Sequence, residues 1–247
     1  MIPLKTLPDA KRAPLWTRAI ALSVALVGLV QLALHFLVGI DLASAYGVRP
    51  GCYFSPTSCG VNSLVSPNSD GVLQWSVEPL GRVLLAPFVA PWLHANGWHI
   101  GFNLLFLLVF GGAVEEELGR WRFLRLYIGG ALAASACHVL FHPTSFVPTI
   151  GASGAIAAVL GAHFRRLPRA WVLTYFPPVF LLPVPGWLWG ALWVLLQIGG
   201  ALRLPYLSSA TGGDVAWMAH IGGFAWGFWA ARRAKTPRKL KTFSAFS

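Results

Sequence analysis

Long apolar stretches dominate this chain of 247 residues and constrain its fold more than any other feature. The first stretch runs from 19 to 40, which is long enough to cross a bilayer, since a spanning helix needs roughly 20 residues. Hydrophobic residues make up 56% of the chain and charged residues only 11%, far from the composition of a soluble globular domain. These features predict a multi-pass integral membrane protein in contact with the lipid bilayer.

Five further apolar stretches follow the first, at 97–114, 123–141, 147–164, 186–202 and 215–231. We therefore expect an all-α membrane protein in which six transmembrane helices form one domain over 19–231. A polar N-terminus at 1–18 precedes the domain, and a basic tail at 232–247 follows it. The alternative for the first stretch is a cleaved signal peptide, but the apolar core of a signal peptide has only about 7 to 15 residues.

The positions of the Lys and Arg residues predict the orientation of the chain. The net charge of +11 comes mostly from short basic runs between the apolar stretches. The aromatic residues lie inside the apolar stretches and do not alternate with the basic ones, which argues against a nucleic-acid partner. With the N-terminus in the cytoplasm, all but three of the 19 Lys and Arg residues fall on the inner side, as the positive-inside rule demands. We expect both termini in the cytoplasm, and a bacterial inner membrane is the default.

Two segments do not fit the helical pattern. Residues 41–95 form a long external loop rich in Gly, Pro and Ser, and we expect its apolar second half to lie on the membrane surface. Cys52 and Cys59 in this loop flank a short turn, and they are candidates for a disulfide if the loop faces an oxidising compartment. Residues 170–185 are apolar but are broken by four prolines, so we interpret them as an interfacial segment.

Polar residues inside apolar spans are costly and tend to mark function. In the predicted topology Ser153, His220 and the pair His99 and Asn103 lie at one outer depth in three different spans. Two of these spans also carry small residues that let helices approach closely: Gly154, Ala158 and Ala162 in span four, and Ala219, Gly223, Gly227 and Ala231 in span six. If these stripes meet, the Ser153 hydroxyl lies within hydrogen-bonding reach of His220.

A serine beside a histidine is the arrangement of an activated nucleophile. His99 and Asn103 are four residues apart and share a helix face, so both can act with the Ser153 backbone N–H as oxyanion donors. Glu115, Glu116 and Glu117 lie at the inner end of span two, where we expect a solvated helix end. The predicted chemistry is therefore a Ser-His dyad without a metal or other cofactor. The alternative is that serine and histidine only serve helix packing.

These residues, in this order and spacing, resemble the rhomboid family of intramembrane serine proteases. The matching positions are His94, His99 and Asn103 at span two, Glu115 and Gly119 at its inner end, Gly151, Ser153 and Gly154 at the start of span four, and His220, Gly223 and Gly227 in span six. The resemblance covers about residues 80 to 231. It implies that Ser153 is the nucleophile and His220 the general base. It also implies that His99, Asn103 and the Ser153 amide hold the oxyanion, with His94 and Glu115 mainly structural.

The resemblance further implies that the substrates are transmembrane proteins, cut near the outer membrane face after entry beside spans two and five. Span five contains three tryptophans that would suit a gate: Trp187, Trp189 and Trp193. Many relatives have an aromatic residue that supports the histidine one turn after the serine, but here that position is Ala157.

Two other functions compete with the protease. One is a catalytically inactive rhomboid-like protein that binds transmembrane clients. The other is a transporter or channel, which is disfavoured because the chain has no detectable inverted repeat and no charged residue in mid-span.

Overall fold

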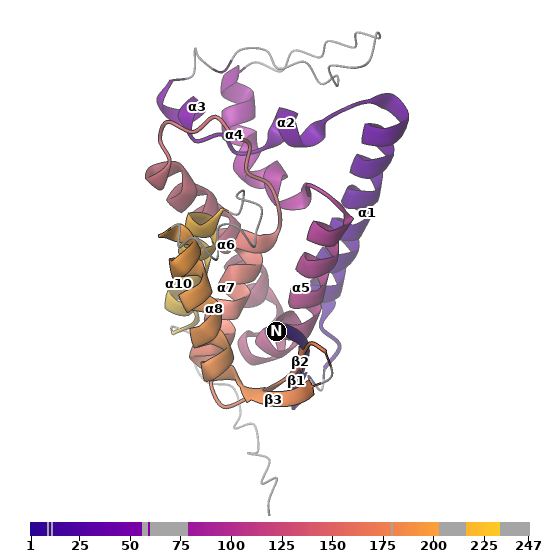
Figure 1. Ribbon diagram of the computed structural model, residues 1–247, viewed down its shortest axis with the longest axis vertical. Helices are drawn as coiled ribbons and strands as arrows, with labels where there is room; N and C mark the ends of the chain where they lie inside the picture. The colour runs from indigo at the N-terminus through magenta and orange to yellow at the C-terminus, as the bar shows by residue number, and fades with distance from the viewer. Residues whose placement is uncertain are drawn as a thin grey trace, which may run out of the picture.

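The computed structural model describes residues 1–8, 10, 12–55, 59, 79–178, 180–202 and 216–232. The six main helices of this described part are α1 (Leu15–Val38), α5 (Gly97–Leu118), α6 (Arg120–Phe141), α7 (Ser153–Arg166), α8 (Gly186–Ala201) and α10 (Trp217–Ala231). They occupy the stretches predicted from the sequence (Figure 1). The predicted basic tail lies, beyond Arg232, outside the described residues.

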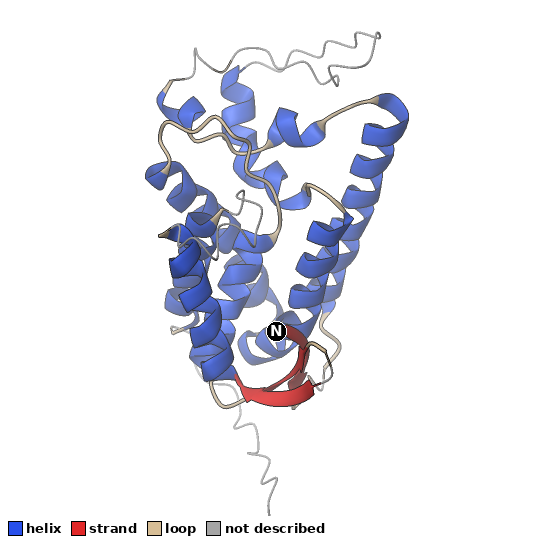
Figure 2. Cartoon of the chain, in the orientation of Figure 1, coloured by secondary structure: helices blue, strands red, loops and turns tan. Residues whose placement is uncertain are grey.

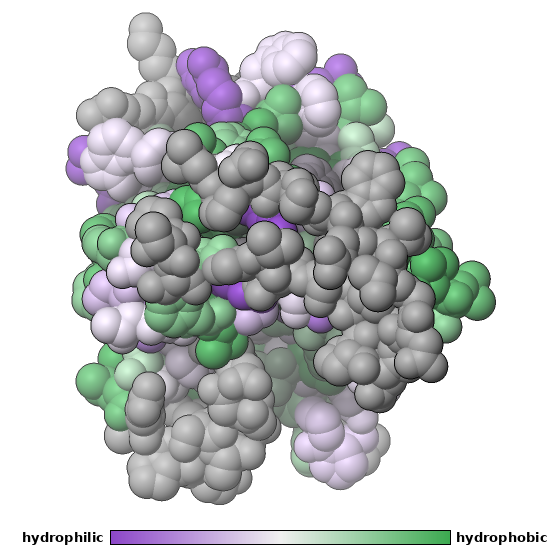
Figure 3. Space-filling model, turned by 90° about the horizontal axis from the view of Figure 1, so that it is seen from above, coloured by the Kyte–Doolittle hydropathy of each residue, from purple (hydrophilic) through white to green (hydrophobic). Residues whose placement is uncertain are grey.

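The described helices support an integral membrane protein. Three of them, α1, α5 and α6, are long and apolar enough to cross a membrane, whereas α8 is a shorter apolar helix. Large side chains on α1, such as Leu22, Leu26 and Leu29, are more than half exposed. Apolar residues gather around the sides of the molecule when it is seen from above (Figure 3), as expected of a surface in contact with lipid. The count of six spans stays a prediction.

The expectation of an all-α fold is wrong at one end of the bundle. There β1 (Ile2–Leu7), β2 (Trp171–Phe176) and β3 (Phe180–Pro185) form an antiparallel sheet in the order β1-β2-β3 (Figure 2). Proline cannot donate to a sheet ladder and is confined to edges and turns. The prolines at 177 and 178 accordingly lie in the turn, and those at 183 and 185 lie in the edge strand β3. The segment 170–185 is thus a hairpin, and we call this end of the bundle the sheet end.

The other end carries the long loop, and we call it the loop end (Figure 1). Its described helices are α2 (Leu42–Tyr46), α3 (Gly51–Phe54), α4 (Pro79–Val89) and the 3₁₀ turn η2 (Ala90–Trp92). A disulfide joins Cys52 to Cys59. Val48 and Thr149 exchange backbone hydrogen bonds of 2.9 and 2.8 Å, so the loop is attached to the segment that leads into α7.

Helix α7 lies at the centre of the core because most of its side chains are small. Ala155, Ala157, Ala158 and Val159 are at most 1% exposed. A Cβ atom added at Gly223 of α10 would collide with the Gly154 carbonyl, and one added at Gly227 would collide with the Ala158 carbonyl. The two stripes of small residues therefore meet as predicted, and they bring the backbones of α7 and α10 into contact.

Glu115 attaches the first helix to the C-terminal end of α5. Its carboxylate accepts hydrogen bonds from the backbone N–H groups of Trp16 (3.0 Å) and Thr17 (2.8 Å) and from the Thr17 hydroxyl (2.8 Å). A helix start leaves such N–H groups without partners and favours a negative charge. Our expectation of a solvated helix end is wrong, because Glu115 is only 3% exposed and Glu117 forms an ion pair with Arg166. Gly119, with a φ of 81°, ends α5.

Candidate active site

Ser153 is the first residue of α7, and Gly151 determines how the chain reaches it. Gly151 has a φ of +116°, a conformation that side chains rarely adopt. A Cβ atom there would lie 2.7 Å from Cε1 of His99 and 3.7 Å from the Ser153 hydroxyl oxygen. Glycine at this position therefore leaves room for the His99 ring directly against the backbone that leads into Ser153.

His220 reaches the serine from the first turn of α10. Its Nε2 atom lies 2.8 Å from the Ser153 Oγ, a hydrogen-bond distance at which the hydroxyl can donate to the imidazole. The stripe contact between α7 and α10 sets this approach, because a Cβ atom at Gly223 would collide with the Gly154 carbonyl and push the two helices apart. The structure thus joins two residues that are 67 positions apart in sequence.

Gln197 is a third residue in hydrogen-bonding contact with the pair Ser153 and His220, and we did not predict it from the sequence. Its Oε1 atom lies 2.7 Å from Nδ1 of His220. The Trp193 ring lies beside the same imidazole, with centroids 6.0 Å apart at 38°, so α8 provides the support that Ala157 cannot. The available signal was a single amide in an otherwise apolar helix, since polar groups in a span tend to mark function.

His99 and Asn103 line the same cavity from α5. The backbone N–H of Ala95 donates to Nδ1 of His99 at 3.4 Å, so the ring proton resides on Nε2. That is the ring nitrogen near Gly151, two residues before Ser153. The Asn103 amide donates to the His99 carbonyl at 3.0 Å, which leaves its second N–H as a further donor. The two side chains share one helix face, as predicted.

His94 is a buried support for the loop before Ser153. Gln31 of α1 accepts from the His94 backbone N–H (2.9 Å) and donates to its carbonyl (2.7 Å). The His94 ring lies 3.2 Å from the Trp92 carbonyl through Nδ1, and its Nε2 accepts from the Ala152 N–H at 3.5 Å. Burial lowers the pKa of His94 to about 4, and the charge of nearby His99 adds to this effect. The neutral imidazole is therefore the form that holds Ala152.

The cavity around these residues has a volume of about 1430 Å³. Ser153, His220, His99, Asn103 and His94 all line it, and so do residues 40–43 and 147–150, so it lies toward the loop end. Glu115 and Gly119, at the C-terminal end of α5, are not among its lining residues. A cavity of this size, lined by polar as well as apolar residues, can admit water and a peptide segment. Among the described residues no cluster of potential metal ligands occurs.

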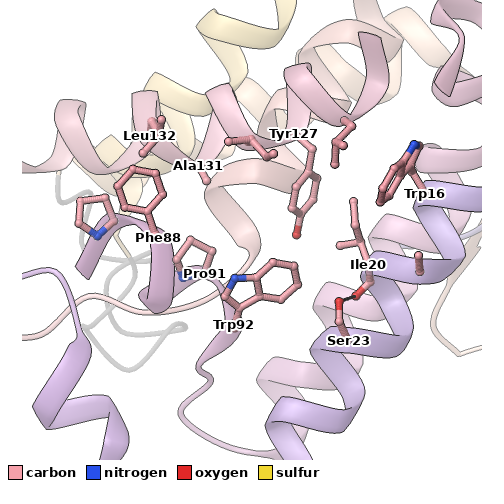
Figure 4. Close-up of a pocket in the computed structure, with 13 residues that line it drawn as sticks. Trp16, Ile20, Ser23, Phe88, Pro91, Trp92, Tyr127, Ala131 and Leu132 are labelled. Atoms are coloured by element: carbon pink, nitrogen blue, oxygen red, sulfur yellow. Dashed lines mark hydrogen bonds between the residues drawn. The ribbon is translucent and has the colours of Figure 1, made fainter. Parts of the chain in front are cut away.

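A second cavity, of about 360 Å³, is apolar and separate from these residues (Figure 4). It lies between α1, η2 and α6, and its lining includes Trp16, Ser23, Trp92 and Tyr127. None of the predicted site residues contributes to it, so the chemistry predicted from the sequence concerns the larger cavity.

Fold and cavity together define a helical membrane protein that holds a serine, a histidine and an amide in hydrogen-bonding contact inside its bundle. A family model described as the Rhomboid domain matches residues 82–234. The chain therefore belongs to the rhomboid family, as its motifs indicated.

Curated relatives agree with this assignment. Rhomboid protein 1, mitochondrial, of Saccharomyces cerevisiae is 33% identical over 137 residues, which cover 53% of this chain and 36% of that protein. The human presenilin-associated rhomboid-like protein, mitochondrial, is 26% identical over 160 residues, covering 62% of this chain and 38% of that protein. The chain thus matches less than two fifths of the length of either relative. Both relatives are named as mitochondrial, whereas we expected a bacterial membrane, so the source membrane stays a prediction.

Proposed function

We propose that this chain is an intramembrane serine endopeptidase that cleaves transmembrane proteins by means of Ser153 and His220. The observation that carries the proposal is the 2.8 Å contact between Ser153 Oγ and His220 Nε2 inside the polar cavity. Membership of the rhomboid family adds support. No metal or cofactor is needed, since hydrolysis by a serine requires only a base, donors for the oxyanion and water.

In the proposed reaction the Ser153 oxygen attacks the scissile carbonyl while Nε2 of His220 takes the hydroxyl proton. The negative oxygen that develops accepts hydrogen bonds from His99, Asn103 and the Ser153 backbone N–H. His220 then gives the proton to the leaving amine, which departs as the acyl-enzyme forms. Water attacks that ester with His220 again as base, and the serine hydroxyl is restored.

The substrate must expose a carbonyl that is hydrogen-bonded within its own helix. A spanning helix satisfies all its backbone groups internally, so it has to unwind locally before attack. We therefore expect small or helix-destabilising residues near the cut. The cavity provides room for such an unwound segment, and its position at the loop end is consistent with cleavage near the outer membrane face.

We place the loop end outside and the sheet end in the cytoplasm, with six spans over 19–231. The Cys52–Cys59 disulfide supports this orientation, because such bonds persist in oxidising compartments. The N-terminal residues 1–18 and the tail from 232 then lie in the cytoplasm. Strand β1, within this N-terminal segment, belongs to the sheet at the same end.

The second candidate is an inactive rhomboid-like protein that binds transmembrane clients. Fluorophosphonate probes distinguish the two functions because they react with an activated serine and require no known substrate. We expect purified wild-type protein to be labelled and to cleave a model transmembrane substrate, and Ser153→Ala to lose both properties. Asn103→Ala should slow cleavage by about 100- to 1000-fold, the usual effect of losing one oxyanion donor.

Ser23→Ala is the matched control, since Ser23 lies in the separate apolar cavity, and it should retain wild-type activity. Cleavage by Ser153→Ala at the wild-type rate would refute the proposed enzyme. Client binding without labelling of any variant would favour the inactive protein.

A further inference from the structure

We propose that Gln197 is a positioning residue that holds His220 in the tautomer able to accept the serine proton. The inference rests on the proposed protease function and extends its pair of residues to a Ser-His-Gln series across α7, α10 and α8. It starts from two contacts of one imidazole, with Ser153 Oγ 2.8 Å from Nε2 and Gln197 Oε1 2.7 Å from Nδ1.

The orientation of the Gln197 amide follows from its other end. Its Nε2 atom donates to the backbone carbonyl of Trp193, one turn earlier in α8, at 3.2 Å. A carbonyl oxygen can only accept, so the NH₂ group must face Trp193 and Oε1 must face His220. The amide is therefore fixed by its own helix and presents an acceptor to the histidine.

This acceptor selects one form of the neutral imidazole. Oε1 accepts from Nδ1 only when Nδ1 carries the proton, which leaves the lone pair of Nε2 directed at Ser153. With the opposite tautomer, Nδ1 and Oε1 would face each other as two acceptors, and Nε2 would have no lone pair for the serine proton. In serine proteases the wrong tautomer lowers kcat strongly even when the geometry is intact.

The neighbours of His220 do not replace this contact. The rings of Trp193 and Trp217 lie 6.0 and 6.4 Å from the imidazole, but an indole N–H only donates. They can restrict the ring plane without choosing its tautomer. Gln197 does both.

In these surroundings an amide is more favourable than the carboxylate found in the Ser-His-Asp triad of soluble serine proteases. Gln197 is 5% exposed in a helix whose other side chains are apolar. A buried carboxylate in a span is expensive unless it is paired. A neutral amide with both ends hydrogen-bonded avoids that cost and still accepts from Nδ1. Gln197 therefore gives His220 a hydrogen-bond partner at Nδ1 without placing a charge in the contact.

The test compares purified Gln197→Met and Gln197→Leu with wild type, for fluorophosphonate labelling and for kcat and KM on a model substrate. Met keeps the length of Gln without the amide, and Leu serves if Met perturbs folding. We expect kcat and labelling to fall by about 10- to 100-fold, as when a ligand histidine loses its outer partner, while KM stays unchanged. Gln197→Glu should restore most of the rate, because a protonated carboxyl can accept from Nδ1 and donate to the Trp193 carbonyl.

Leu195→Met is the matched control, since Leu195 is on the exposed face of α8, and it should behave as wild type. Wild-type rates in Gln197→Met and Gln197→Leu would overturn the inference and leave the protease intact. So would a failure of Gln197→Glu to recover activity when its thermal midpoint equals that of wild type. If the wild-type protein itself were not labelled, the proposed protease function would be refuted, and this inference would be refuted with it.

Discussion

At the scale of single residues, the site depends on one glycine that has no chemistry of its own. Gly151 combines a positive φ with close contact to the His99 ring, so a side chain there meets two independent penalties. The backbone conformation costs a non-glycine residue about 1–3 kcal/mol, and the His99 ring would have to move. The position of His99, the proposed oxyanion donor, thus depends on the absence of a Cβ atom at Gly151.

We expect Gly151→Ala to lower the rate of fluorophosphonate labelling by about tenfold or more, the equivalent of at least 1.4 kcal/mol. Gly101→Ala is the control, because Gly101 is in α5 with open space around its Cβ position. An alanine there should leave labelling unchanged and slightly favour the helix. Equal labelling of both variants would contradict the role given to Gly151.

His94 makes stability depend on pH. Its folded pKa of about 4 lies below the ordinary value near 6.5, so between these values the unfolded chain binds a proton that the folded chain does not. Its contribution to stability is therefore complete above about pH 6.5 and is lost as pH falls toward 4. From pH 7 to pH 5, wild type should lose about 2 kcal/mol more unfolding free energy than His94→Gln. Denaturant titrations in detergent at both pH values measure this difference. Equal losses of unfolding free energy in wild type and in His94→Gln would contradict it.

The sequence predicted the cavity residues with recognisable spacing and missed those without it. Ser153, His220, His99 and Asn103 were found because each occurs in a motif or on a predicted helix face. Gln197 and Gln31 belong to no motif, and their partners, His220 and His94, are distant in sequence. Only the packing of α8 and α1 reveals what these amides contact.

At the scale of elements, the close contact between α7 and α10 is the main support of the site. A Cβ atom at Gly223 or Gly227 of α10 would collide with a backbone carbonyl of α7, and one at Gly154 of α7 would collide with Ala134 of α6. These stripes were predictable because small residues four apart lie on one helix face. The three-stranded sheet was not, because the pairing of β1 with β2 joins segments about 170 residues apart, a relation that local periodicity does not contain.

We expect Gly227→Ala to lower the thermal midpoint and the labelling rate together, although Gly227 lies a full turn from the Gly223 contact. Overpacking a close interface costs about 1–3 kcal/mol, and separation of α10 from α7 moves His220. Gly112→Ala is the matched control, since its Cβ would meet Pro14 at an ordinary 3.5 Å. An unchanged midpoint in Gly227→Ala would show that the helices do not need this contact.

At the scale of the whole molecule, the proposed orientation separates two kinds of surface. The loop end carries the disulfide and the cavity, whereas the sheet end carries Glu115 and the ion pair between Arg166 and Glu117. Hydrophobicity predicted six helices in the right places, but it could not decide how many cross the membrane, because three of the six are shorter than a typical span.

Cysteine labelling from the two faces tests this orientation. In a Cys137→Ser background, an impermeant maleimide should reach Ala95→Cys from outside, and Arg122→Cys and Trp171→Cys only from the cytoplasmic side. All three positions are exposed in the structure, and one crossing by α5 followed by two more by α6 and α7 requires this pattern. Labelling of Ala95→Cys and Arg122→Cys from one side would rule out a crossing by α5.

The sheet also anchors the start of α8. The helix begins at Gly186, directly after β3, and β3 is bound through β2 to the first residues of the chain. Gln197 lies about 17 Å further along the helix axis, at about 1.5 Å per residue. A tilt of about 10° about that anchored base would carry its amide about 3 Å, more than enough to break the bond to His220. Under the proposed function, a tilt of α8 that admitted a substrate would therefore separate Gln197 from His220, and the helix would have to return before His220 could act as the base.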